Sequence, residues 1–167
     1  MTKLIRTSLA TLALLTATVA FAQSDAQKSF DQLKTLAGSW EGSGRNGTPL
    51  EVSFSDMSAG SAIMSEIHGA GPEHHMVSMF NMDGPNRLLV THYCSVGNQP
   101  RMQASTSADG KTITFTYVDA TNLASPDSGH MEQLVIAVLD NNHHTEDWTF
   151  IDHGKQTKEF FDLRRKL

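Results

Sequence analysis

Apolar and polar residues alternate with a period of two along most of this chain, from Trp40 to Arg164. Such alternation predicts β-strands that bury one face. Turn residues interrupt it about every eight to twelve positions, and pairs such as Asp83-Gly84, Asp109-Gly110 and His153-Gly154 suit tight hairpins. About ten short strands in succession predict an all-β fold.

Consecutive hairpin-linked strands favour a single antiparallel up-and-down β-barrel over an open sheet, because closure removes the exposed strand edges. Residues 26–37 precede the strands and place Phe30 and Leu33 on one face at helical spacing. We therefore expect a short N-terminal α-helix there. A barrel of about eight or more strands has room inside for side chains or for one small ligand, so the predicted fold implies a cavity.

The first 22 residues predict a signal peptide. Lys3 and Arg6 precede an apolar run that ends in Ala20-Phe21-Ala22, a pattern that signal peptidase cleaves. The run is too short to predict a membrane span. We therefore expect residues 23–167 to form one barrel domain that is periplasmic or secreted.

Charge and cysteine content restrict the partners and the means of stabilisation. The chain has 18 acidic and 13 basic residues, and loss of Lys3 and Arg6 would leave a net charge of −7 before histidine is counted. This acidic balance predicts no nucleic-acid partner. Cys94 is the single cysteine and cannot form an internal disulfide. The sequence leaves the oligomeric state open.

Two motifs carry a resemblance to known barrels. Residues 33–44 place Gly38-x-Trp40 directly after the expected helix, and residues 97–102 read Gly-Asn-Gln-Pro-Arg-Met. The chain resembles calycin-type barrels and is similar to a bacterial secreted lipocalin-like family of unknown function. The resemblance implies that Trp40 closes one barrel end and that an arginine of the last strand covers it. Arg164 is the expected residue, and Arg165 is the alternative.

A more distant resemblance is to nitrobindin-like barrels. The shared motif consists of Gly38, Trp40, Gly42 and Gly44. Nitrobindins ligate haem through a histidine near the chain end, but the last predicted strand of this chain has none, and His153 lies in a predicted turn. We therefore expect no haem cofactor, while a haem or metal binder stays an alternative function.

The strand around His92 is the richest in reactive side chains. Alternation puts Leu88, Val90, His92 and Cys94 on one face and Tyr93 on the other, and the first face is the more apolar. We expect His92 and Cys94 to line the cavity. They lie about 6.5–7 Å apart along the strand, too far for the hydrogen bond of a nucleophile and its base. A small enzyme that uses His92 remains a further alternative.

Four other residues complete the predicted ligand-binding set. Asn98 suits the turn after Cys94, and Arg101 follows it near the barrel mouth, where an inward guanidinium would bind a carboxylate. Pro100 leaves the direction of Arg101 open. The remaining members are Met76 and Met102, which would fill an irregular cavity, and Trp148, which would form an aromatic wall.

Histidine pairs do not by themselves predict a metal site. His74-His75 and His143-His144 are adjacent in sequence, and adjacent strand residues point to opposite faces. A metal site would need histidines from several strands, so we predict no metal site.

The sequence also lacks the usual signatures of catalysis. Glu146 and Asp147 give no defensible carboxylate pair, and motifs of hydrolases, nucleotide binders and dithiol enzymes are absent. The sequence predicts a binding barrel for a small apolar or amphiphilic ligand, with an enzyme the less favoured hypothesis.

Overall fold

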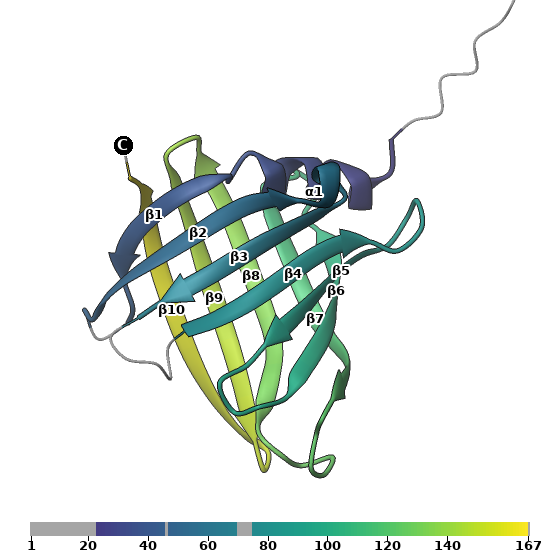
Figure 1. Ribbon diagram of the computed structural model, residues 1–167, viewed down its shortest axis with the longest axis vertical. Helices are drawn as coiled ribbons and strands as arrows, with labels where there is room; N and C mark the ends of the chain where they lie inside the picture. The colour runs from purple at the N-terminus through teal and green to yellow at the C-terminus, as the bar shows by residue number, and fades with distance from the viewer. Residues whose placement is uncertain (1–22, 46, 70–74, 167) are drawn as a thin grey trace, which may run out of the picture.

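A computed structural model describes residues 23–45, 47–69 and 75–166, which contain a closed barrel of ten antiparallel strands (Figure 1). The predicted signal peptide and His74 lie outside the described residues. The elements are α1 (Asp25–Lys34), β1 (Gly38–Ser43), β2 (Pro49–Met57), η1 (Ser58–Gly60), β3 (Ala62–His68), β4 (His75–Met82), β5 (Leu88–Tyr93), β6 (Gln99–Thr106), β7 (Thr112–Thr121), β8 (His130–Asp140), β9 (His143–Asp152) and β10 (Lys155–Arg165). The predicted up-and-down barrel with a short N-terminal helix is confirmed.

The barrel closes along a seam between its first and last strands. Each strand pairs with the next one in the chain, and β10 then pairs with β1 so that Gly42 lies opposite Leu163. The two backbones approach closely at this point, since a Cβ on Gly42 would lie 2.0 Å from the carbonyl oxygen of Asp162. Glycine is therefore the residue that fits this position of the seam.

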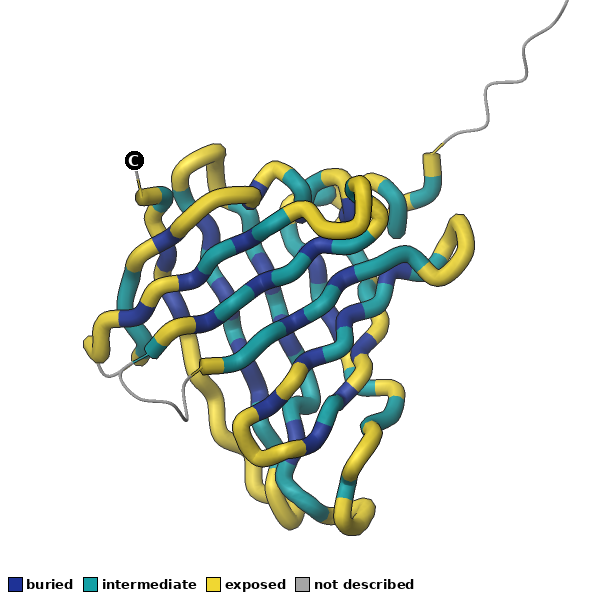
Figure 2. Tube along the Cα trace, in the orientation of Figure 1, coloured by how far each residue is buried: buried dark blue, intermediate teal, exposed yellow. Residues whose placement is uncertain are grey.

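Most of the interior of the barrel is an apolar core. Buried residues recur at every second position along most strands, as Figure 2 shows. Trp40, Phe80 and Phe115 are among the largest fully buried side chains. Burial of each such side chain contributes about 1.5–3 kcal/mol relative to exposure, so the alternating pattern supplies most of the stabilisation that a chain without a disulfide needs.

The helix α1 covers one end of the barrel. The side chain of Ser24 caps it by accepting a hydrogen bond from the backbone N–H of Gln27, and Phe30 and Leu33 are buried in the barrel core. The helix ends at Lys34, earlier than the expected Ala37. Residues 35–37 instead form a turn that leads into Gly38, whose φ of +123° lies outside the helical region.

The closing arginine is Arg165, so the expectation of Arg164 is wrong. The Arg165 guanidinium stacks on the Trp40 ring and donates hydrogen bonds to the carbonyls of Thr35 and Ala37. Arg164 points to the outer face of the barrel, with 63% of its side chain exposed. The two-residue period of β10 explains the difference, because the residue opposite Trp40 is one position further along the strand.

The other end of the barrel is not covered by α1. At this second end, which we call the open end, strands β1, β3, β5, β7 and β9 finish and strands β2, β4, β6, β8 and β10 begin. In Figure 1, α1 lies at the top of the barrel and the β7–β8 and β9–β10 connections lie at the bottom.

Among the residues that the structure describes, no helix has the length and apolar character needed to cross a membrane.

Candidate functional site

An apolar pocket of about 260 Å³ lies at the open end. Six of its lining residues are apolar side chains from β2, β3, β4, β8, β9 and β10: Leu50, Ile67, Met76, Met131, Trp148 and Phe161. Arg45 and Glu159 also line it and supply opposite charges. The pocket therefore combines an apolar interior with two ionisable groups, the arrangement typical of sites for small ligands.

Trp148 is held in a fixed orientation where it lines the pocket. Its indole Nε1 donates a hydrogen bond to Oε2 of Glu146 at 2.9 Å, and the other carboxylate oxygen lies 3.4 Å from Nε2 of His144. These three residues occupy alternate positions on β9 and all point inward, because the strand period is two. Glu146 and His144 are 1% and 0% exposed, so this polar chain is buried in the core.

His92 lies directly behind Trp148. Its ring centroid is 4.8 Å from that of Trp148, and its Nδ1 forms a 2.9 Å hydrogen bond with Ser78 on the neighbouring strand β4. Its Nε2 is buried and has no hydrogen-bond partner among the residues that the structure describes. Desolvation by burial lowers the pKa of His92 to about 4, so the ring is neutral at physiological pH.

The predicted orientation of the residues near His92 is confirmed. His92 is fully buried, Cys94 is 9% exposed, and Tyr93 is 50% exposed on the outer face. Within the described residues no hydrogen bond joins His92 to Cys94, since His92 bonds to Ser78 instead. Burial raises the pKa of the Cys94 thiol. This environment suits an inert thiol rather than an activated nucleophile.

Asn98 stabilises the turn that follows β5, as expected from its position. The backbone N–H of Cys94 donates to the carbonyl of Asn98, and Gly97 between them has a φ of +90°. The side-chain amide of Asn98 donates to the carbonyl of Gly129 at 2.7 Å. This bond joins the β5–β6 turn to the β7–β8 connection at the open end.

Arg101 points away from the cavity. Its guanidinium forms a bidentate ion pair with Asp119 on β7, and both side chains are about half exposed on the outer face. A β-bulge interrupts the β6–β7 register between Arg101 and Met102, and Met102 is fully buried in the core. The direction that Pro100 left open is therefore outward, and Arg101 does not contact the pocket.

The structure brings together part of the predicted ligand-binding set. Met76 and Trp148 line the pocket, and His92 contacts Trp148 from behind. Met102 lies in the core, Cys94 lies in the turn after β5, and Arg101 lies outside the barrel. A ligand-binding role for any of these residues stays a prediction.

Sequence reasoning missed several residues of this region. Glu146 and Ser78 hold Trp148 and His92, and Leu50, Ile67 and Phe161 complete the apolar wall. Glu146 shares the period-two face of Trp148, so alternation alone would have placed it inside. However, carboxylates without a partner are rarely found in protein cores, and this argued against an inward Glu146.

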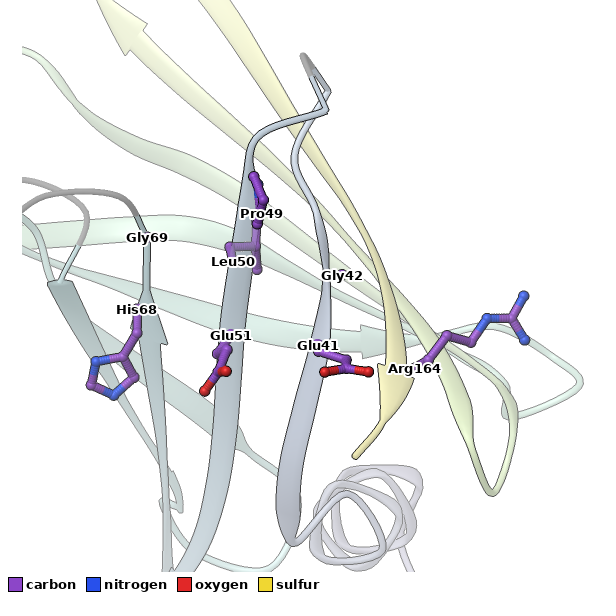
Figure 3. Close-up of a pocket in the computed structure, with 8 residues that line it drawn as sticks. All are labelled: Glu41, Gly42, Pro49, Leu50, Glu51, His68, Gly69 and Arg164. Carbon is purple, nitrogen blue, oxygen red and sulfur yellow. The ribbon is translucent and has the colours of Figure 1, made fainter. Parts of the chain in front are cut away.

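A second hollow lies on the outer face of the barrel. It is a shallow groove of about 620 Å³ bordered by residues of β1, β2, β3 and β10, including Glu41, Glu51, His68 and Arg164 (Figure 3). These four residues are successive cross-strand neighbours in the barrel register. The groove is open to solvent and lined by charged groups, whereas the apolar pocket at the open end is the more enclosed of the two.

Comparison with known proteins gives a likeness in fold. No protein-family model and no curated protein matches the sequence. Among solved structures, the crystal structure of Rv2717c from M. tuberculosis superposes with a TM-score of 0.57 at 14% sequence identity, covering 83% of this chain and 98% of that chain. At this identity the likeness shows the fold alone. The chain is therefore similar to Rv2717c in its overall fold.

Proposed function

We propose that this barrel binds one small apolar or amphiphilic molecule in the pocket at its open end. The observation that carries the proposal is the 260 Å³ apolar pocket formed by side chains of six different strands. Its volume lies just below the about 300 Å³ at which sites for drug-sized ligands begin. A ligand of modest size, with an apolar body, fits this space best.

The pocket wall is pre-organised for binding. Trp148 is anchored by Glu146 on one side and packed on His92 on the other, so little side-chain freedom is lost when a ligand contacts its ring. Arg45 and Glu159 offer a charged contact of either sign to a polar head group. These features support an amphiphilic ligand whose apolar body contacts Trp148 and whose polar end lies near these charges.

The two tryptophans allow a direct test, because Trp148 lines the pocket whereas Trp40 is fully buried and does not line it. In the Trp40→Phe variant, Trp148 is the remaining fluorophore, and addition of decanoate should change its emission in a saturable way. In the Trp148→Phe variant, the emission of Trp40 should stay constant, since that ring is buried at the end covered by α1. Circular dichroism checks that both variants fold.

A matched pair of substitutions on β4 locates the binding site. Met76→Trp adds volume inside the pocket, whereas Met79→Trp adds the same group to the outer face of the same strand. Anilinonaphthalene sulfonate should bind Met76→Trp at least about tenfold more weakly than Met79→Trp. A tenfold change in Kd corresponds to about 1.4 kcal/mol of binding free energy. Equal affinities, together with an unresponsive Trp148, would show that the pocket is not the site.

We also propose that the protein is exported. The support is the pattern of Lys3, Arg6 and the apolar run that precedes Gln23. Mass spectrometry of protein from the periplasmic fraction should give a chain that begins at Gln23. An unprocessed chain in the cytoplasmic fraction would contradict this.

A further inference from the structure

Three potential metal ligands meet on the outer wall of the barrel. Glu66 and His68 lie on β3 and His75 lies on β4, and one donor atom from each lies within 4.8 Å of the other two. The imidazole rings of His68 and His75 stack with their centroids 4.5 Å apart. Nε2 of His75 lies 3.8 Å from Oε1 of Glu66.

The strand register explains why these three side chains converge. Glu66 and His68 are two residues apart, so both point outward while Ile67 between them points into the pocket. His68 is the direct cross-strand partner of His75, and side chains of such pairs start only about 4.5–5.5 Å apart at Cβ. Two imidazoles and one carboxylate are thus held together by the backbone of two neighbouring strands.

The separation of the donor atoms is close to what a metal ion requires. Bonds of about 2.0–2.2 Å in a tetrahedral site place the donor atoms about 3.3–3.6 Å apart. The 3.8 Å between His75 and Glu66 is near this value, and the remaining distances, at most 4.8 Å, close with modest side-chain rotation. Glu66 is partly buried and both histidines are exposed, so the site is accessible to an ion from solvent.

A second carboxylate lies next to the cluster. Glu51 on β2 is the cross-strand partner of His68, and Figure 3 shows both side chains at the groove on the outer face. Lys166 donates a hydrogen bond to Glu51 at 2.8 Å and helps to hold its pKa below the usual range. A further carboxylate therefore lies beside the three residues, on the same outer face of the barrel.

We propose that Glu66, His68 and His75 form a surface site for a divalent first-row transition metal ion, with Zn²⁺ as the reference ion. Imidazole and carboxylate are ligands that Zn²⁺ prefers, and Cu²⁺ binds such donors more tightly in the general affinity order. Three protein ligands leave at least one coordination position toward solvent. The site is separate from the proposed pocket ligand, because His75 points outward while its neighbour Met76 points inward.

The test is calorimetric titration of the untagged, metal-free protein with ZnCl₂. We expect one saturable site in the wild type. His68→Ala and His75→Ala should each weaken it at least about tenfold, since even second-shell substitutions cost about 10- to 100-fold. His153→Ala is the matched control, because this exposed histidine lies in the β9–β10 turn and contacts Asp152. The Zn²⁺ affinity of the His153→Ala variant should equal that of the wild type.

Two further variants distinguish Zn²⁺ binding at this site from Zn²⁺ binding elsewhere on the protein. The Glu66→Gln variant keeps the shape of the side chain and removes its charge, so it should bind Zn²⁺ more weakly without loss of thermal stability in the apo form. Met76→Trp, which blocks the pocket, should leave Zn²⁺ affinity unchanged, so the failure of one proposal is distinguishable from the failure of the other. Absence of stoichiometric binding, or binding that survives loss of both His68 and His75, would overturn the assignment.

Discussion

Arg165 lies opposite Trp40 across the barrel seam, and its guanidinium carbon is 4.2 Å from the centre of the indole ring. The same guanidinium donates to carbonyls of Thr35 and Ala37 in the turn after α1, and to that of Asn141 in the β8–β9 turn. The indole Nε1 in turn donates to the carbonyl of Leu36. One side chain of the last strand therefore joins the first strand, the helix turn and a neighbouring hairpin.

We predict that Arg165→Ala lowers the free energy of unfolding by about 2–3 kcal/mol, whereas Arg164→Ala changes it by less than about 0.5 kcal/mol. The reason is that Arg165 loses a cation–π contact and three charge-assisted hydrogen bonds, while Arg164 is exposed on the outer face. Urea denaturation of both variants checks this. Equal losses in the two variants would contradict the closing role of Arg165.

Trp40→Ala should cost about 3–5 kcal/mol, because it removes a fully buried aromatic side chain and leaves a cavity under α1. Urea denaturation monitored by circular dichroism measures the loss. A loss below about 1 kcal/mol would show that neighbouring side chains refill the space and that Trp40 is not the closing residue. Trp40→Phe should be the milder change, since it keeps a ring in the core.

His92 makes stability depend on pH in a defined window. Burial lowers its folded-state pKa to about 4, while the unfolded chain titrates near the ordinary value of about 6.5. Below pH 6.5 the unfolded state binds a proton that the folded state does not, so acid favours unfolding. The loss should approach about 1.4 kcal/mol per pH unit and total about 3 kcal/mol by pH 4. Above pH 6.5 this contribution does not change.

Denaturation curves between pH 4 and pH 8 measure the effect. His92→Asn removes the titrating group, so its stability should fall less steeply with acid than that of the wild type, with a difference of about 3 kcal/mol at pH 4. His153→Asn makes the same substitution at an exposed side chain and serves as the matched variant. Parallel profiles for His92→Asn and the wild type would refute the assignment to His92.

Cys94 should react slowly with iodoacetamide in the folded protein at neutral pH. Its thiol is buried and its pKa is raised by that burial, so little thiolate is present or accessible. Labelling should become rapid in urea. Fast labelling of the folded protein that is suppressed in His92→Ala would instead indicate an activated nucleophile and favour the enzyme alternative.

We expect no saturable Soret band when haem is added to the metal-free protein. The last strand carries no histidine, and the described pocket lining provides Met76 and Met131 as its sulfur donors without an imidazole. Absorption titration of the wild type measures this directly. A stoichiometric band that disappears in His92→Ala would promote the haem alternative, because no described residue forms a hydrogen bond with Nε2 of His92.

The period-two pattern was sufficient to predict the barrel and the direction of most side chains. His92 and Tyr93 point to opposite faces because this depends only on the strand pleat. The same rule predicted that His143 and His144 separate, and His143 indeed bonds to Asp162 outside while His144 is buried. Local geometry of this kind needs no knowledge of which strands become neighbours.

The features that could not be predicted depend on register between strands. The bond between Ser78 and His92 requires the β4–β5 pairing, and the convergence of Glu66, His68 and His75 requires His68 to lie opposite His75. No local pattern fixes these offsets, since hydrophobic alternation specifies a face but accepts several registers that differ by two residues. The choice between Arg164 and Arg165 is a different case, because Arg165 shares the buried face of Phe161 and Leu163, so the two-residue period of β10 already favours it.

The seam between β1 and β10 also has a consequence for how the protein folds. Every other strand pairing in the barrel joins sequence neighbours, whereas Trp40 must find Arg165 at the far end of the chain. Local hairpins close rapidly, and a pairing with so large a loop carries the greatest entropic cost. We therefore expect the sheet to grow strand by strand and to close last. A ribosome-bound chain that lacks β10 would keep the edge of β1 unpaired until β10 has been synthesised.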